Sequence, residues 1–206
     1  MVCHRSGGVI ATAHSYSVSI HNLKGLSLYA SYTLDLPPSL LDFSPNGKQI
    51  VTACNDKLRI ITPKTEEIVK VAGNHFHQAE ITSLAVSPTV ILSGCIEGEV
   101  FASNLGKGNI LGKFDSFKGA INSISIADNY ALIAPQSNGV FWNDINKLKT
   151  IFHSPPDISV TAIAKISHSH NYAFSDLKGS IHLVDSRAPM KIIKKLEAGN
   201  SIHALE

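Results

Sequence analysis

Apolar residues along the chain gather in short segments, and the order of these segments repeats at an almost constant spacing. Stretches with the pattern apolar-x-x-apolar-x-apolar begin at Ile81 and Ile121. Related stretches begin at Val160 and Ile202, so the four starting positions lie 40, 39 and 42 residues apart. In each complete unit, three more segments rich in Ile, Val, Leu and Phe follow between turn residues. Short apolar segments bounded by turn residues predict four β-strands per unit.

A glycine recurs between the second and third segments of three units, at Gly98, Gly139 and Gly179. These glycines are 41 and 40 residues apart. The chain must reverse direction there within about two residues, and such hairpins favour the positive φ that glycine adopts at little cost. No stretch shows a sustained helical period with capping residues at its ends. The pattern therefore predicts an all-β chain of four-stranded antiparallel units.

A four-stranded unit of this length is typical of a β-propeller blade. The sequence resembles the WD-repeat family over its whole length. "FSPNGKQIVTACNDKLRI", from Phe43, is similar to the family's first strand, turn, second strand and third strand. "GSIHLVDSRAP", from Gly179, is similar to a third strand that ends in a Trp-Asp-like pair followed by Arg. This resemblance implies a β-propeller built of WD-repeat-type blades.

The sequence departs from the family pattern at two kinds of position. The Trp of the Trp-Asp pair is absent from most equivalent positions, where "RIIT", "FASN" and "HLVD" stand instead. The Gly-His that opens a family repeat is reduced to His75 or His77. We therefore expect the hydrogen-bonded tetrad of regular family members to be missing, and the blades to depend on apolar packing.

The repeat divides one domain of residues 1–206 into five visible blades, at about 1–35, 36–76, 77–116, 117–155 and 156–200. The first unit is predicted to contribute only three strands, without an inner one. Residues 201–206 are predicted to be the inner strand of a further blade or of the first blade. The first possibility makes the chain part of a larger ring, and the second closes a ring of five blades. We favour the larger ring, because five blades are unusual in the family that the sequence resembles.

Composition and charge narrow the class of protein without naming a function. The chain has 206 residues, of which 44% are apolar and 17% are charged, and its net charge is +2. Such a small charge gives no reason to expect direct nucleic-acid binding or a membrane surface. No window approaches the ~18 apolar residues of a membrane helix. Three widely spaced cysteines do not make a disulfide framework, so we expect a reducing compartment, the cytosol or the nucleus.

Candidate catalytic and metal-binding residues are few. His75 and His77 are alternate residues near Glu80, and His168 and His170 form a similar pair, but a metal site needs a third or fourth ligand. Cys54 and Cys95 occupy equivalent repeat positions and are expected in the core. The chain also lacks a serine elbow and a phosphate-binding loop. We therefore expect an enzymatically inactive protein with no catalytic residues, no metal and no cofactor.

A propeller without a catalytic set generally recognises other proteins through its loops. The loops between blades and between second and third strands share one face. The candidate partner-binding residues on these loops are His75, Phe76, His77, Gln78, Glu97, Phe117 and Lys118. The two phenylalanines lie in polar connections, so they either bind a partner or pack between blades. We expect a protein-interaction scaffold or adaptor in a multiprotein complex.

Two further resemblances imply more specific roles. "AGNHFHQAEITSLAV" and "VDSRAP" are similar to segments of the angio-associated migratory cell protein and of the related dedicated chaperone of a large-subunit ribosomal protein. This similarity implies a ribosome-biogenesis assembly factor with a ribosomal protein or a ribonucleoprotein complex as its partner. "AFSDLKGSIHLVDSRAP" resembles a blade of a phosphatase regulatory subunit, so a regulatory subunit of a phosphatase or ubiquitin-ligase complex is the other alternative.

Overall fold

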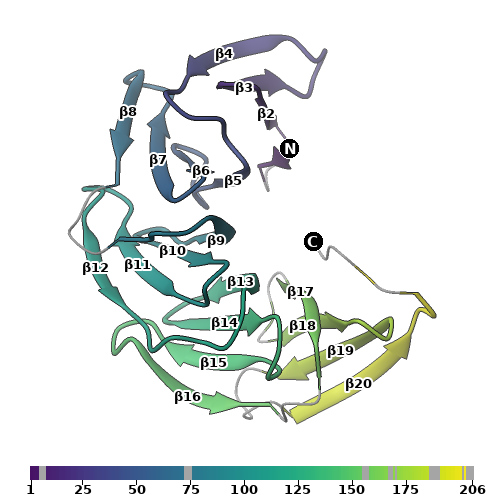
Figure 1. Cartoon of the computed structure of the whole chain (residues 1–206). Coiled ribbons are helices and arrows are strands. Elements are labelled where there is room, and N and C mark those ends of the chain that lie inside the picture. Colours follow the sequence, from purple (N-terminus) through teal and green to yellow (C-terminus); the bar gives the residue numbers. More distant parts are fainter. Residues whose placement is uncertain are drawn as a thin grey trace.

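The computed structural model describes residues 1–4, 8–71, 76–154, 158–166, 169, 171–185, 191–200 and 202. It contains 20 strands in five four-stranded antiparallel sheets. The sheets stand side by side in an arc, with the first and fifth at its two ends (Figure 1). This arrangement is that of a β-propeller and confirms the predicted fold class. Within these described ranges, no helix is long and apolar enough to cross a membrane.

The strands of each blade are consecutive in the chain. The first blade consists of β1 (Val2–Cys3), β2 (Val9–His14), β3 (Ser17–Asn22) and β4 (Leu28–Thr33). The second consists of β5 (Leu40–Phe43), β6 (Ile50–Cys54), β7 (Lys57–Thr62) and β8 (Glu67–Lys70). The third consists of β9 (Ile81–Val86), β10 (Val90–Cys95), β11 (Val100–Asn104) and β12 (Ile110–Lys113). The fourth consists of β13 (Ile121–Ala127), β14 (Tyr130–Pro135), β15 (Phe141–Asp144) and β16 (Lys149–His153). The fifth consists of β17 (Val160–Lys165), β18 (Asn171–Asp176), β19 (Ser180–Asp185) and β20 (Lys191–Glu197).

The predicted three-stranded first unit was wrong, because this blade has its own inner strand. Val2 pairs with Ala11 and Cys3 with Ile10, which places β1 at the inner edge of the first sheet. A strand of two residues is too short to show an alternating pattern, so it could not be predicted from apolar periodicity. Of residues 201–206, the structure describes only Ile202, whose carbonyl oxygen accepts a hydrogen bond from Thr161 of the fifth blade.

Apolar side chains fill the boundaries between neighbouring blades. Ile60 of the second blade and Ile91 of the third share one buried cluster, whereas Leu92 and Ile133 share the next. Adjacent residues of a strand point to opposite faces of its sheet, so β10 is buried on both faces. Strands of this kind read as continuous apolar runs in the sequence. The packing of blade on blade therefore accounts for most of the core.

The recurring glycines occupy hairpins with the predicted conformation. Gly98, Gly139 and Gly179 have φ of +83°, +75° and +79°. At Gly98 there is a second requirement, because a Cβ there would lie 2.1 Å from the carbonyl oxygen of Phe117. The hairpin of the third blade thus fits closely under the connection to the fourth blade. The structure also confirms that Cys54 and Cys95 are buried free thiols.

Candidate functional site

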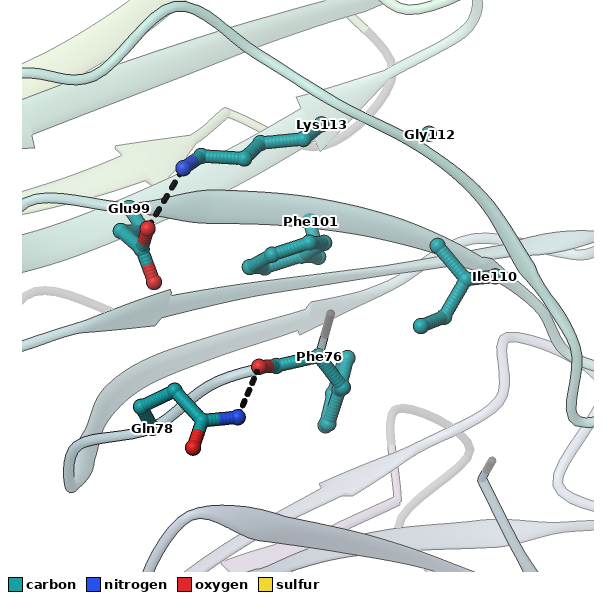
Figure 2. Close-up of a pocket in the computed structure, with 7 residues that line it drawn as sticks. All are labelled: Phe76, Gln78, Glu99, Phe101, Ile110, Gly112 and Lys113. Carbon is teal, nitrogen blue, oxygen red and sulfur yellow. Dashed lines mark hydrogen bonds and ion pairs between the residues drawn. The ribbon is translucent and has the colours of Figure 1, made fainter. Parts of the chain in front are cut away.

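A pocket of about 680 Å³ opens on the outer part of the third blade (Figure 2). Its walls come from the connection that precedes β9, the start of β11 and the outer strand β12. The residues that line it are Phe76, Gln78, Glu99, Phe101, Ile110, Gly112 and Lys113. The pocket therefore joins one predicted interaction loop, at residues 76–78, to strands that the sequence did not single out.

The apolar part of the pocket consists of Phe76, Phe101 and Ile110. The rings of Phe76 and Phe101 pack in a tilted arrangement with centroids 5.3 Å apart. Both rings are largely buried in the cluster between the second and third blades. Next to them, Gln78 Nε2 donates a hydrogen bond of 3.0 Å to the backbone oxygen of Phe76. This bond holds the exposed Gln78 side chain at the mouth of the pocket.

An ion pair stands at the rim of the pocket. Lys113 Nζ lies 2.5 Å from Glu99 Oε1 and 5.6 Å from the centre of the Phe101 ring. The Lys113 and Glu99 side chains are 38% and 23% exposed, so water screens the pair, and we expect it to contribute less than about 1 kcal/mol to stability. A weak, accessible ion pair beside an aromatic ring is suited to exchanging its partners with an incoming ligand.

His77 lies behind the pocket and is buried. Its Nε2 atom is 3.1 Å from the carbonyl oxygen of Ser93 and 2.9 Å from Ser93 Oγ. Its ring packs edgewise against Phe76 and Phe101, at 4.7 Å from each. Burial is the main cause that lowers the pKa of His77 to about 4, so the imidazole is neutral at physiological pH. The blades were expected to depend mainly on apolar packing, and the contact of His77 with Ser93 adds a polar tie within the third blade.

The structure separates the predicted interaction residues into buried and exposed groups. Gln78, Glu97 and Lys118 are exposed. Phe76 and Phe117 are each only 9% exposed, so most of each ring packs against neighbouring side chains. The ring of Phe117 contacts Phe141 in the cluster between the third and fourth blades, with centroids 5.0 Å apart.

Glu97 and Lys118 belong to neighbouring connections on the third blade. The amide of Phe117 donates a hydrogen bond of 2.9 Å to the carbonyl oxygen of Gly98, which ties the two connections together. Gln78 lies on the preceding connection and faces the pocket instead. His75 lies outside the described residues.

Three pocket residues, Glu99, Phe101 and Lys113, were not among the residues predicted from the sequence. Glu99 lies in the turn immediately before β11 and Phe101 lies two residues further on in that strand, a spacing that places side chains on one face of an extended chain. Lys113 pairs with Phe101 across β11 and β12. The register of these strands shifts between Ala102 and Ser103, and such a bulge cannot be located from apolar alternation. Only the spacing of Glu99 and Phe101 could have been noticed in advance.

The second and fifth blades have polar pairs near the equivalent register position. Arg59 pairs across the sheet with Lys70, and His182 pairs with Lys195, as Phe101 pairs with Lys113. Arg59 is buried and donates from Nε and one terminal nitrogen to the two carboxylate oxygens of Asp35, at 3.1 and 3.0 Å.

The fifth blade uses a different pair at this position. His182 Nε2 lies 2.9 Å from Asp176 Oδ2, and both side chains are buried. Burial raises the pKa of Asp176, but hydrogen bonds from His182 and from backbone amides outweigh that effect and leave the pKa below its usual value. In the third blade this row of the sheet borders the aromatic pocket described above.

Comparisons with known proteins establish the fold and leave the family open. No protein-family model and no curated protein sequence matches this chain. The solved structure of the computationally designed Ika8 protein is similar to 97% of this chain, with a TM-score of 0.79 and 15% identity. A chain of the Mitotic Checkpoint Complex is similar to 95% of it, with a TM-score of 0.82 and 16% identity. This chain spans 62% of the length of each.

Proposed function

We propose that this chain is a non-enzymatic protein-interaction platform whose third blade binds a segment of a partner protein. The observation that carries the proposal is the pocket in which Phe76, Phe101 and Ile110 lie beside the accessible Glu99–Lys113 ion pair. Such a site suits an apolar side chain of the partner that is followed by a charged one. The similarity to a chain of the Mitotic Checkpoint Complex supports protein partners in general, without identifying them.

The energetics of this site favour a protein ligand. Apolar groups that cover the exposed parts of the aromatic rings gain about 25 cal/mol per Å² of area removed from water. Covering the rim also excludes water from the Glu99–Lys113 pair, so a partner must supply charges that replace or complete it. This requirement gives specificity, because a partner with the wrong charge at that point leaves a buried charge unpaired.

The proposal is tested by capture of partners from cell extract with the wild-type chain and with two charge-reversal variants. Lys113→Glu should lose the captured partners, because the pocket rim would then place two carboxylates together. Lys195→Glu is the matched control, since Lys195 pairs with His182 in the fifth blade as Lys113 pairs with Phe101 in the third. An identical partner set for all three proteins would refute the pocket, and turnover abolished by mutating one polar cluster would refute the non-enzymatic function.

A second candidate function is that of an assembly factor for ribosomal particles. It rests only on the resemblance of the short segments "AGNHFHQAEITSLAV" and "VDSRAP" to the ribosomal-protein chaperone subgroup, which no match to a curated sequence supports. Co-sedimentation with pre-ribosomal particles would favour this role, whereas capture of phosphatase or ubiquitin-ligase subunits would favour a regulatory subunit. We propose the cytosol or nucleus as its compartment, which the three free cysteines support.

A further inference from the structure

Three potential metal ligands converge behind the pocket of the third blade. A ring nitrogen of His77, the Sγ atom of Cys95 and a carboxylate oxygen of Glu99 all lie within 4.8 Å of one another. His77 comes from the connection before β9, Cys95 is the last residue of β10, and Glu99 follows in the turn to β11. We infer that these three residues form a binding site for a divalent transition-metal ion of the zinc class. This site shares Glu99 with the proposed partner-binding pocket, but metal binding does not require a partner protein.

The hydrogen bonds of His77 leave one nitrogen ready to bind a metal. A carbonyl oxygen only accepts hydrogen bonds, so the 3.1 Å contact with the Ser93 carbonyl assigns the ring hydrogen to Nε2. The lone pair then lies on Nδ1, which is buried and has no hydrogen-bond partner among the described residues. Metal-bound histidines commonly donate their other ring hydrogen to a backbone carbonyl in this way. The orphaned Nδ1 atom therefore has the tautomer and surroundings of a ligand.

Cys95 and Glu99 complete a set whose charge matches a divalent cation. Cys95 is fully buried and is not in a disulfide. When the metal–sulfur bond forms, the thiol gives its proton to solvent. Glu99 exchanges its ion pair with Lys113 for a bond to the metal. The thiolate and the carboxylate then supply two negative charges beside a neutral imidazole.

The ligand types and the geometry both indicate zinc rather than a hard cation. A nitrogen, sulfur and oxygen set suits Zn²⁺ or Co²⁺, whereas Mg²⁺ and Ca²⁺ select oxygen ligands alone. Bonds of about 2.1 Å in a tetrahedral site place ligand atoms roughly 3.5 Å apart, so the group must contract by about 1 Å. Glu99 can provide this movement because its side chain stands at the pocket rim. Its position there also gives an ion and a fourth ligand, such as water, a route from solvent.

The second blade offers a matched comparison. Cys54 ends β6 as Cys95 ends β10, and both thiols are fully buried. In the second blade, the residue opposite Cys54 across the hairpin is Lys57, which is not a metal ligand in this setting. In the third blade, the hairpin after Cys95 is longer and contains Glu99. Among the described residues, His77, Cys95 and Glu99 are the one group of three ligands this close together. A metal site at Cys95 but not at Cys54 is thus a specific prediction of the geometry.

The test uses Co²⁺ as a spectroscopic probe, added alone to the purified, chelator-treated chain. The inference expects one Co²⁺ per chain, a sulfur-to-cobalt charge-transfer band and displacement by Zn²⁺. Cys95→Ser should abolish the band, while Cys54→Ser should retain it. Glu99→Gln should weaken Co²⁺ binding by at least about tenfold. This nearly isosteric change at the rim keeps the test valid if a buried variant fails to fold. A chain without the band, or a band that survives in Cys95→Ser, would overturn the site.

Discussion

Thr82 Oγ1 donates a hydrogen bond of 2.7 Å to the backbone oxygen of Ile121, across the boundary between the third and fourth blades. The same tie recurs one blade further on, where Asn122 Nδ2 donates to the oxygen of Val160 at 2.9 Å. Thr161 repeats it toward the oxygen of Ile202. Each donor is the second residue of an inner strand. Each acceptor is the residue at which the next repeat begins. Ile202 therefore lies beside the fifth blade in the place that Ile121 holds beside the third.

Replacing Thr82 by Val tests this tie between blades. The substitution keeps the shape of the side chain but removes the donor, so the oxygen of Ile121 loses that partner. We expect the free energy of unfolding to fall by about 1–2 kcal/mol. Urea unfolding measures the change, with Thr89→Val as the control because Thr89 lies exposed on a turn of the same blade. Equal losses in the two variants would show that the tie contributes nothing of its own.

The repeat could be predicted from the sequence because its signal depends only on local periodicity. The apolar residues Ile81, Ile121 and Val160 open inner strands, as expected, and the glycines between second and third strands have the expected positive φ. These features follow from strand packing and hairpin conformation, and the same pattern is present separately in each unit. The two-residue strand β1 had no such pattern and was missed.

The candidate site was less predictable because it depends on contacts between elements. Phe76 and Phe117 lie in connections, where no alternation indicates whether a side chain points inward or outward. The meeting of Lys113 with Glu99 depends on a register that a bulge shifts. His77 reaches Cys95 only because the connection before β9 folds back over β10. Sequence alone therefore identified the loop at residues 76–78 but not the residues it contacts.

A substitution of Gly98 separates backbone strain from steric overlap. Gly98→Ala places a methyl group 2.1 Å from the oxygen of Phe117, at a φ of +83°. Gly25→Ala meets a similar φ, +94°, but its Cβ has no atom within 4 Å. We expect the Gly25 variant to lose about 1 kcal/mol of stability, and the Gly98 variant to lose at least about 2 kcal/mol more. Thermal unfolding of both variants measures the difference, which should vanish if the connection at Phe117 moves aside freely.

The stability of the first two blades should depend on pH through Asp35. Hydrogen bonds from Arg59, and secondarily from Lys70, hold the pKa of Asp35 well below its usual value. A carboxyl group with a lowered folded-state pKa stabilises the protein above its unfolded pKa of about 4, and this contribution is lost as pH falls below that value. Asp35→Asn should therefore lower the urea midpoint at pH 7, and the difference from wild type should shrink steadily below pH ~4.

Asp115 provides the control for this pH dependence. Asp115 follows Phe114 as Asp35 follows Leu34. The amide of Phe114 donates a hydrogen bond to the oxygen of Val100 in β11, and the amide of Leu34 donates one to the oxygen of Tyr16 in the first blade. The two aspartates therefore occupy equivalent positions in their blades. Asp115 is exposed, and Asp115→Asn should leave the difference between the midpoints at pH 7 and pH 3 as in wild type. A constant gap between Asp35→Asn and wild type over the whole range would mean that the charge of Asp35 does not act through Arg59.

The role of Phe117 can be decided by a stability measurement, because binding and packing predict opposite results. Its ring lies in the cluster between the third and fourth blades, against Phe141. Phe117→Ala should open a cavity there and reduce the free energy of unfolding by about 3 kcal/mol or more. Lys118→Ala, at the exposed neighbouring position, should change it by less than about 0.5 kcal/mol. If both variants unfold like wild type while Phe117→Ala alone loses captured partners, Phe117 is a binding residue and the packing role is rejected.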